Sequence, residues 1–271
     1  MQKIILIGLI FILMMQPAWA LTKNQKLCSS NNPDTAIKGC TAMIQSGRDS
    51  KLNLSVAYFN RGVAHYHKKL YEQAVTDLTH SIALNPNDAD AYYVRGMSYY
   101  VTNRHDQAIT DFNKAIAIKP DFAAAYGQRG VAYYKKHLYD QAISDYKKAI
   151  ALEPDRPSNY FNLALTYSVI GSSKQAIIYW TKVLELTPSD AEAYNLRAWV
   201  YHIMGENAKG LIDANKAIEL SPTSNHLEIR AKIYEGLGMR ENAIADYRAS
   251  LKIDPNNQSS LDGLKRLGVT P

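Results

Sequence analysis

Proline recurs along this chain at a nearly constant interval. The prolines are Pro86, Pro120, Pro154, Pro188, Pro222 and Pro255, and the intervals between them are 34, 34, 34, 34 and 33 residues. A period of this length is typical of arrays of small stacked units, in which each unit contacts only its neighbours. The 271 residues therefore need not enclose one central core.

Each period predicts two helices with a polar turn between them. In the second copy, apolar and small residues recur three and four positions apart over residues 89–101 and 107–118, which is helical spacing. Four copies place a residue type that tolerates the left-handed backbone in the turn. These residues are Asn103, Gly171, Gly205 and Gly238. Lys69 and His137 stand there in the first and third copies, where we expect slight strain.

The residue after each proline is expected to cap the helix that follows, because its short polar side chain can accept a hydrogen bond from the first turn. The six residues are Asn87, Asp121, Asp155, Ser189, Thr223 and Asn256.

The copies also share aromatic and small residues at fixed places. In the second copy these are Tyr92, Gly96, Tyr99, Ala108, Phe112, Ala115 and Pro120. The pattern resembles the tetratricopeptide repeat, and the resemblance extends over residues 55–257. It implies an all-α fold, a right-handed α-solenoid of about six stacked helix-turn-helix repeats with helical caps at both ends. We expect the repeats at 55–88, 89–122, 123–156, 157–190, 191–223 and 224–257.

The first residues predict export. Lys3, an apolar run over residues 4–15 and the sequence Ala18-Trp19-Ala20 are typical of a secretory signal peptide over residues 1–20. The apolar run is too short to span a bilayer, although an uncleaved anchor is the alternative. No later segment of the mature chain is apolar enough to be an integral membrane segment. We expect a bacterial periplasm, with secretion outside the cell as the alternative.

Both ends of the mature chain are expected to cap the array. Residues 21–54 form an N-terminal segment with a helix that begins near Asn32, and they hold both cysteines of the chain, Cys28 and Cys40. In an oxidising compartment this pair predicts a disulfide that contributes roughly 3 kcal/mol. Residues 258–271 are expected to form a C-terminal capping helix and tail. Self-association through uncapped ends is a further alternative, against which both capping helices argue.

Five copies carry an arginine before the small residue of the first helix, and an aspartate follows each arginine sixteen positions later. The pairs are Arg61 with Asp77, Arg95 with Asp111, Arg129 with Asp145, Arg197 with Asp213, and Arg230 with Asp246. The fourth copy lacks both partners and has Leu163 and Tyr179 instead. Because losing one partner alone would leave a buried charge, the joint change predicts structural ion pairs, within a hairpin or across to its neighbour. A nucleic-acid site is the hypothesis that this pairing disfavours.

In the family that the chain resembles, the first helices line a concave groove. The resemblance implies that partner polypeptides contact aromatic and apolar side chains there. These are Phe59, Tyr66, Tyr93, Met97, Tyr100, Tyr134, Phe161 and Trp199. For Tyr66, Tyr100 and Tyr134, packing between helices is the alternative.

The net charge and the remaining motifs predict no nucleic-acid, metal, cofactor or catalytic site. The net charge of +6, from 31 basic and 25 acidic residues, is scattered and does not predict nucleic-acid binding. The seven histidines show no metal-ligand spacing, and no nucleophile, phosphate or dinucleotide motif is present, so we expect no cofactor and no enzyme. The sequence predicts a scaffold or adaptor that binds a protein or peptide, with a secreted, effector-like factor as the alternative.

Overall fold

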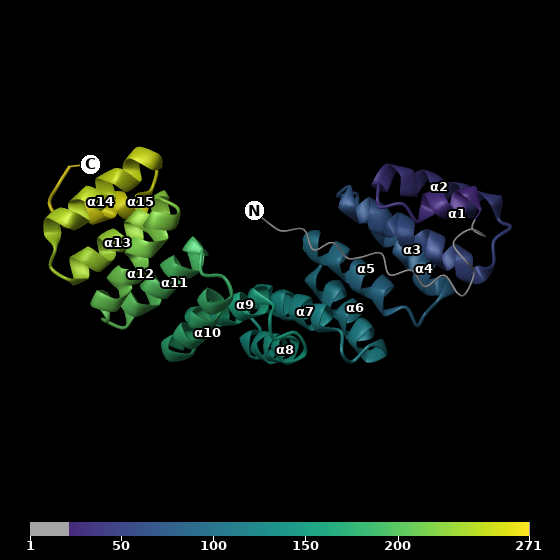
Figure 1. Ribbon diagram of the computed structural model, residues 1–271, viewed down its shortest axis with the longest axis horizontal. Helices are drawn as coiled ribbons and strands as arrows, with labels where there is room; N and C mark the ends of the chain where they lie inside the picture. Colours follow the sequence, from purple (N-terminus) through teal and green to yellow (C-terminus); the bar gives the residue numbers. More distant parts are fainter. Residues whose placement is uncertain (1–21, 271) are drawn as a thin grey trace. The chain divides into compact units, whose positions relative to one another are not determined.

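The computed structural model describes residues 22–270, and this part of the chain is all α-helical (Figure 1). The helices are α1 (Lys23–Cys28), α2 (Pro33–Ser46), α3 (Lys51–His67), α4 (Tyr71–Leu84), α5 (Ala89–Val101), α6 (His105–Ile118), α7 (Ala123–Lys135), α8 (Tyr139–Leu152), α9 (Pro157–Val169), α10 (Ser173–Leu186), α11 (Ala191–Ile203), α12 (Asn207–Leu220), α13 (Ser224–Gly236), α14 (Arg240–Ile253) and α15 (Gln258–Arg266). The predicted signal peptide lies outside the described residues.

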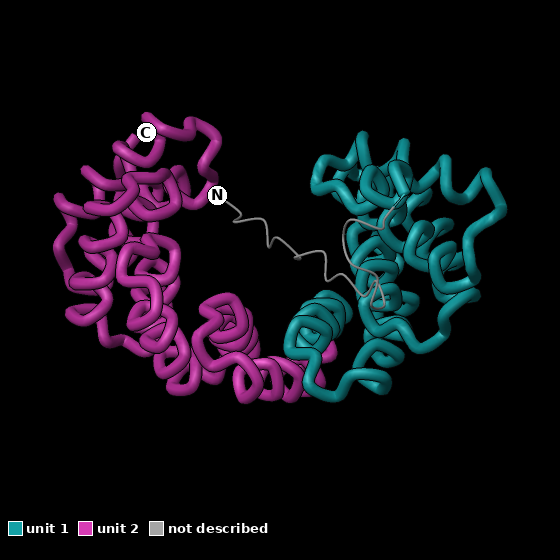
Figure 2. The backbone as a smooth tube through the Cα atoms, turned by 45° about the vertical axis from the view of Figure 1, so that its right-hand side comes forward, with its two compact units in different colours: residues 1–137 teal, residues 138–271 magenta. Residues whose placement is uncertain are grey.

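The chain divides into two compact units, residues 1–137 and residues 138–271, which we describe separately (Figure 2). In unit 1, α3 packs against α4 and α5 against α6, and α4 and α6 each also pack against the helix that follows. Unit 2 repeats this arrangement from α9 to α14. Each hairpin thus buries its apolar faces against the next hairpin, as the period predicts.

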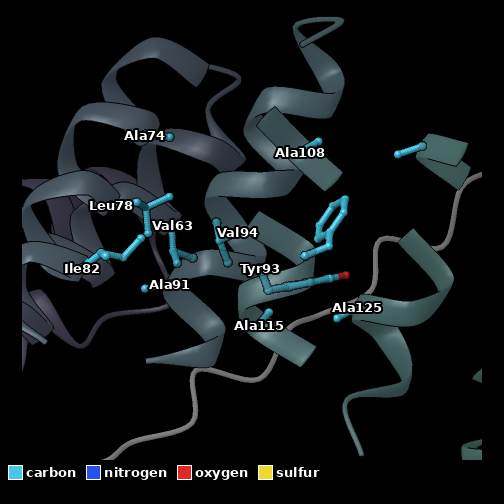
Figure 3. Close-up of a cluster of buried hydrophobic side chains, with 12 residues drawn as sticks. Val63, Ala74, Leu78, Ile82, Ala91, Tyr93, Val94, Ala108, Ala115 and Ala125 are labelled. Carbon is cyan, nitrogen blue, oxygen red and sulfur yellow. The ribbon is translucent and has the colours of Figure 1, made fainter. Parts of the chain in front are cut away.

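Small residues let the two helices of a hairpin approach closely. A Cβ atom added at Gly96 of α5 would lie 2.8 Å from the ring of Phe112 on α6. One added at Gly62 of α3 would lie 2.8 Å from Leu78 on α4. Leu78 and Phe112 are fully buried in the core of unit 1, where Figure 3 shows Leu78 and Val94 on adjacent helices. A larger residue at either glycine would force the helices apart.

The turn inside each hairpin has the predicted backbone. Gly171, Gly205 and Gly238 have φ of 75°, 75° and 74°. The non-glycine residues at this place are also left-handed: φ is 61° at Lys69, 60° at Asn103 and 59° at His137. Every repeat therefore needs the same turn, whatever residue stands there.

The helix caps differ from the prediction in most copies. Asp88, Asp190 and Asn257 accept the hydrogen bond from the first turn, and each lies two residues after the proline. Only Thr223 caps directly after its proline. The proline and the residue that follows it form the turn between hairpins, so the cap comes one residue later. The link before Thr223 is one residue shorter because the fifth copy has 33 residues rather than 34.

Both ends of the described chain carry a short helix. The disulfide between Cys28 and Cys40 joins α1 to α2, and both cysteines are buried with Met43 and Ala57. At the other end, α15 packs against α14, and Leu264 is fully buried there. Along residues 22–270, no helix combines the length and apolarity needed to cross a membrane.

The left-handed turns predict that Lys69→Gly stabilises the protein. Lysine at a φ of 61° costs about 1–2 kcal/mol, whereas glycine adds about 0.5–1 kcal/mol of chain entropy cost, so the expected gain is about 0.5–1 kcal/mol. The free energy of unfolding in urea measures it. The control is Lys68→Gly, because φ at Lys68 is −80° and glycine relieves no strain there. Equal effects of the two substitutions would contradict the account.

Candidate partner-binding surface

Four arginines on first helices form the same fork with an aspartate on the second helix of the hairpin. Arg95 on α5 donates from Nε to Asp111 Oδ2 at 2.7 Å and from Nη2 to Oδ1 at 2.8 Å. Burial alone would lower the pKa of Arg95, but the Asp111 carboxylate outweighs it and the pKa is raised. The other forks are Arg61 with Asp77, Arg197 with Asp213 and Arg230 with Asp246. All four aspartates are buried.

A third hydrogen bond extends each fork to the preceding hairpin. Nη1 of Arg95 donates to the hydroxyl of Thr79 on α4 at 3.1 Å, although Arg95 lies on α5. The same nitrogen of Arg61, Arg197 and Arg230 bonds Thr41 on α2, Thr181 on α10 and Asn215 on α12. Arg129 bonds Asn113 on α6 in the same way. One guanidinium therefore bonds both the partner helix of its own hairpin and a helix of the neighbouring hairpin, which fixes how the two stack.

Tyrosines flank the guanidinium groups. The Arg95 Cζ atom lies 5.6 Å from the ring centre of Tyr92 and 5.8 Å from that of Tyr99. These tyrosines stand three residues before and four after the arginine, one helical turn away in each direction. The recurring aromatics of the repeat thus shield the ion pair, besides filling space between hairpins.

The fifth predicted pair, Arg129 with Asp145, joins residues of different units and stays a prediction. Within unit 1, Arg129 donates to Asn113 at 2.6 Å and lies 5.4 Å from the Tyr126 ring.

The fourth copy replaces the whole arrangement. Leu163 stands in place of the arginine and Tyr179 in place of the aspartate, and Tyr179 stacks on Tyr167 with ring centres 5.5 Å apart. The place of the threonine or asparagine on the preceding second helix is taken by Lys147, whose Nζ lies 5.9 Å from the Tyr167 ring. Its interaction with Tyr167 raises the pKa of Lys147. Three residues therefore change together, not two.

This third position is not among the residues predicted from the sequence. A signal was available in three copies, because the residue sixteen positions before Arg95, Arg129 and Arg197 is Thr79, Asn113 and Thr181, and the one before Leu163 is Lys147. The first copy departs from this spacing, since Arg61 bonds Thr41, twenty positions earlier. The fifth copy is one residue shorter, so Asn215 precedes Arg230 by fifteen.

The first helices of unit 1 bring together several of the predicted groove residues, which we call the first-helix surface. It consists of Phe59 and Tyr66 on α3, Met97 and Tyr100 on α5, and Tyr134 on α7. All five are half-buried, and α5 contacts both α3 and α7. The rings of Tyr66 and Tyr71 meet edge to face with centres 5.6 Å apart, and burial raises the pKa of Tyr66 and of Tyr100. These residues pack on the helices and also keep part of their surface open to solvent.

Tyr93, the remaining predicted groove residue of unit 1, is buried, and its contact with a partner stays a prediction. Its side chain is only 5% exposed, and its ring packs against Phe112 and Phe122 with centres 5.9 Å and 5.0 Å away. Figure 3 shows the ring within the buried cluster between α5 and the neighbouring helices. A residue buried this deeply supports packing rather than contact with a partner.

In unit 2, Phe161 and Trp199 are half-buried. Phe161 packs edge-on against Trp180, with ring centres 4.8 Å apart. Trp199 lies beneath a cation, because Nζ of Lys232 is 5.1 Å from its ring centre. Lys232 is in turn bonded to Glu228 at 2.6 Å.

The sixth copy and the last helix carry charges that neutralise one another. Arg266 on α15 bonds Glu235 at 2.8 Å, and Tyr247 donates its hydroxyl to the same carboxylate. Burial, followed by this hydrogen bond, raises the pKa of Tyr247. No three of the His, Cys, Asp and Glu side chains along residues 22–270 come together as metal ligands.

One buried histidine links two first helices of unit 2. Nδ1 of His226, on α13, lies 2.6 Å from the Ser221 carbonyl oxygen, and Nε2 lies 3.3 Å from Glu192 on α11. Only the protonated ring can donate both hydrogen bonds. Burial opposes protonation, but these two partners outweigh it and the pKa of His226 is raised.

The Arg95 fork and its third hydrogen bond join α4, α5 and α6. We expect Arg95→Leu to lower the free energy of unfolding by about 3–5 kcal/mol, because it leaves the buried Asp111 carboxylate without its partner. Thr79→Val removes the link between hairpins, together with the hydrogen bond from the Thr79 hydroxyl to the Val75 carbonyl within α4, and should cost about 1 kcal/mol. Urea denaturation measures both. Arg104→Leu is the matched control: its partner Glu72 is 70% exposed, so the loss should stay below about 1 kcal/mol. An equal loss for Arg95→Leu and Arg104→Leu would refute the role of the buried fork.

The His226 contact predicts a pH dependence of stability. Because the folded pKa is raised above the unfolded value of about 6.5, the contact stabilises fully below that value and is lost as pH rises through the folded pKa. The difference in unfolding free energy between the wild type and His226→Gln should therefore be larger at mildly acidic than at mildly alkaline pH. Taking this difference removes the contributions of other titrating groups. A difference that grows with rising pH would contradict the assignment.

Comparison with known proteins agrees with this architecture. Family models described as TPR repeat or tetratricopeptide repeat match residues 55–88, 96–136, 123–156, 157–190, 179–211 and 228–257. A search of curated proteins found no match.

Several solved structures share the fold. The C-terminal part of a TPR repeat-containing protein from Cytophaga hutchinsonii is 22% identical, with a TM-score of 0.73 over 89% of this chain and 98% of that chain. PilF from Pseudomonas aeruginosa is 18% identical, with a TM-score of 0.68 over 80% and 100%. YrrB, described as a TPR protein with an unusual peptide-binding site, is 22% identical, with a TM-score of 0.62 over 69% and 97%. The repeated hairpins and the family matches along them lead to one conclusion: this chain belongs to the tetratricopeptide-repeat family.

Proposed function

We propose that this protein is a non-catalytic scaffold, and that the first-helix surface of unit 1 binds a segment of a partner polypeptide. Proteins with this fold generally serve as protein-interaction scaffolds. The observation that carries the proposal is that Met97 and Tyr100 on α5 and Phe59 and Tyr66 on α3 all pack, partly open, against one buried cluster, on helices that contact each other. Aromatic and methionine side chains that keep part of their surface open are the usual anchors of peptide recognition.

The composition of this surface favours an extended or helical segment with apolar side chains. Val101, at the end of α5, is 41% exposed and extends the apolar area beyond Tyr100. Two ion pairs of this unit are complete in themselves: Asp111 is enclosed by the Arg95 fork, and Glu72 is paired with Arg104. A partner that buried apolar side chains here would not have to break them, and burial would contribute about 25 cal/mol per Å² of apolar surface.

Unit 2 offers a chemically different contact. The Trp199 ring lies beneath the Lys232 ammonium, and Lys232 is held by Glu228. A carboxylate on the partner could share the Lys232 ammonium while an apolar side chain packs against the open part of the Trp199 ring.

We further propose that the protein works outside the cytoplasm. The signal-like residues 1–20 support export, and the Cys28–Cys40 disulfide persists in oxidising compartments. A Gram-negative periplasm suits an adaptor that holds envelope proteins. The alternative is a secreted factor that engages a host or neighbouring cell, and fractionation of the producing cell separates the two locations.

The proposal predicts that the double variant Met97→Ala, Tyr100→Ala loses its partner. With the oxidised protein as bait on an envelope extract, the yield of the captured protein should fall at least about 10-fold, because these side chains occupy the centre of the surface. The matched control is Thr76→Ala, Thr110→Ala, on exposed positions of the second helices α4 and α6. Capture that is unchanged by the first variant, or reduced equally by both, would contradict the proposal.

A further inference from the structure

The two terminal helices of the described chain are held in different ways. At the end of unit 2, the nine-residue helix α15 is held by packing and by hydrogen bonds to other helices. Leu264 is fully buried against α14. Ser260 bonds Ser250 on α14 at 2.8 Å. Arg266 bonds Glu235 on α13, also at 2.8 Å. All of these contacts are non-covalent.

At the start of unit 1, α1 has few such contacts. Of its six residues only Cys28 is buried, and Lys23 and Lys26 are exposed. In the part of the chain that the structure describes, the polar contacts from α1 to other helices both involve the disulfide. The Asn60 amide nitrogen on α3 lies 3.9 Å from the Cys28 sulfur, and the Cys40 sulfur on α2 lies 3.5 Å from the Cys28 carbonyl oxygen.

The disulfide therefore contributes most to keeping α1 in place. A helix of six residues does not persist in water on its own, because its few hydrogen bonds do not offset the chain entropy that they cost. α1 crosses α2 at Gly39, where an added Cβ atom would lie 2.5 Å from the Cβ atom of Leu27. The bond between Cys28 and Cys40 keeps the two helices at this close approach. Without it, we expect chain entropy to outweigh the burial of one side chain.

In this position α1 covers one edge of α3, the first helix of the first repeat. A narrow hollow lies between them, and its lining includes Cys28 of α1, Met43 of α2, and Val56 and Asn60 of α3. Asn60 is only 9% exposed, and Val56 is half-buried. Val56 precedes Phe59 by three residues and Asn60 directly follows it, so both lie beside a member of the first-helix surface.

We propose that α1 is a cover held by its disulfide, and that reduction releases α1 and adds Val56 and Asn60 to the first-helix surface of unit 1. The oxidised chain then presents a shorter surface to its partner than the reduced chain. This effect on the partner rests on the proposed function, whereas the release of α1 does not.

The reductant is a dithiol. One of its thiolates attacks the sulfur of Cys28, which lines the hollow, and the bond between the two cysteines breaks with Cys40 as the leaving thiolate. The second thiol of the reductant then displaces Cys28 from the mixed disulfide. The two cysteines gain two electrons and two protons, and the reductant leaves as a disulfide.

Hydrogen exchange followed by mass spectrometry tests the release. In the protein reduced with dithiothreitol, the amides of residues 23–28 should exchange at least about 10-fold faster than in the oxidised protein. The amides of α5 and of α15 should keep their rates, because no disulfide holds these helices. The double variant Cys28→Ser, Cys40→Ser should match the reduced protein without any reductant.

Equal protection of residues 23–28 in the oxidised protein and the double variant would overturn the proposal, because α1 would then be held without the disulfide. Faster exchange throughout unit 1 would also overturn it, since reduction would unfold the repeats rather than release α1. So would a disulfide that dithiothreitol does not reduce while the protein is folded.

Capture from an envelope extract tests the effect on the partner. The Cys28→Ser, Cys40→Ser bait should retain at least about 3-fold more partner than the oxidised wild type, because more apolar surface is open. Adding Val56→Ser should remove this gain. Equal capture by the two baits, with Met97 and Tyr100 still required, would refute the cover alone. Capture that no longer requires Met97 and Tyr100 would instead contradict the proposed function.

Discussion

The structure depends on an arginine side chain that links three helices: the helix that carries it and two others to which its guanidinium donates hydrogen bonds. A stack of hairpins has no central core to hold its members in place, so the arrangement of each pair of neighbours must be set locally. The Arg95 fork does this by bonding Asp111 in its own hairpin and Thr79 in the preceding one. Burying the aspartate costs free energy that only a well-placed partner offsets, so the arginine favours one stacking of the hairpins over others.

The fourth copy shows that the fork acts as a set. Where Leu163 replaces the arginine, Tyr179 replaces the aspartate and Lys147 replaces the threonine or asparagine of the preceding hairpin. Apolar contact and the stacked rings of Tyr167 and Tyr179 then occupy the space. The same exchange places Tyr179 beside Tyr160, Ile177 and Ile178 in one open region of the surface. The exchange within the stack has thus also altered the surface.

Much of the fold was predictable, because the 34-residue period, the helical spacing and the left-handed turn each act over a few residues. How deeply each side chain is buried could not be predicted from the sequence. Tyr93 and Phe161 hold the same place in their repeats, yet Tyr93 is buried against Phe122 while Phe161 is half-buried. The burial of each ring depends on the residues that neighbouring hairpins pack against it. The sequence pattern within one copy does not specify those residues. The helix caps were misplaced for a similar reason, since the turn between hairpins uses two residues and not one.

The most direct test of the Arg95 fork is to replace its three residues in the second copy with the residues that occupy the same positions in the fourth copy. The triple variant Thr79→Lys, Arg95→Leu, Asp111→Tyr would reproduce Lys147, Leu163 and Tyr179, with Tyr99 in the place of Tyr167. If the three residues form one unit, the free energy of unfolding of the triple variant lies well above the value that the summed losses of the single variants predict. Additive losses would contradict the account, because they would show that the three positions act independently.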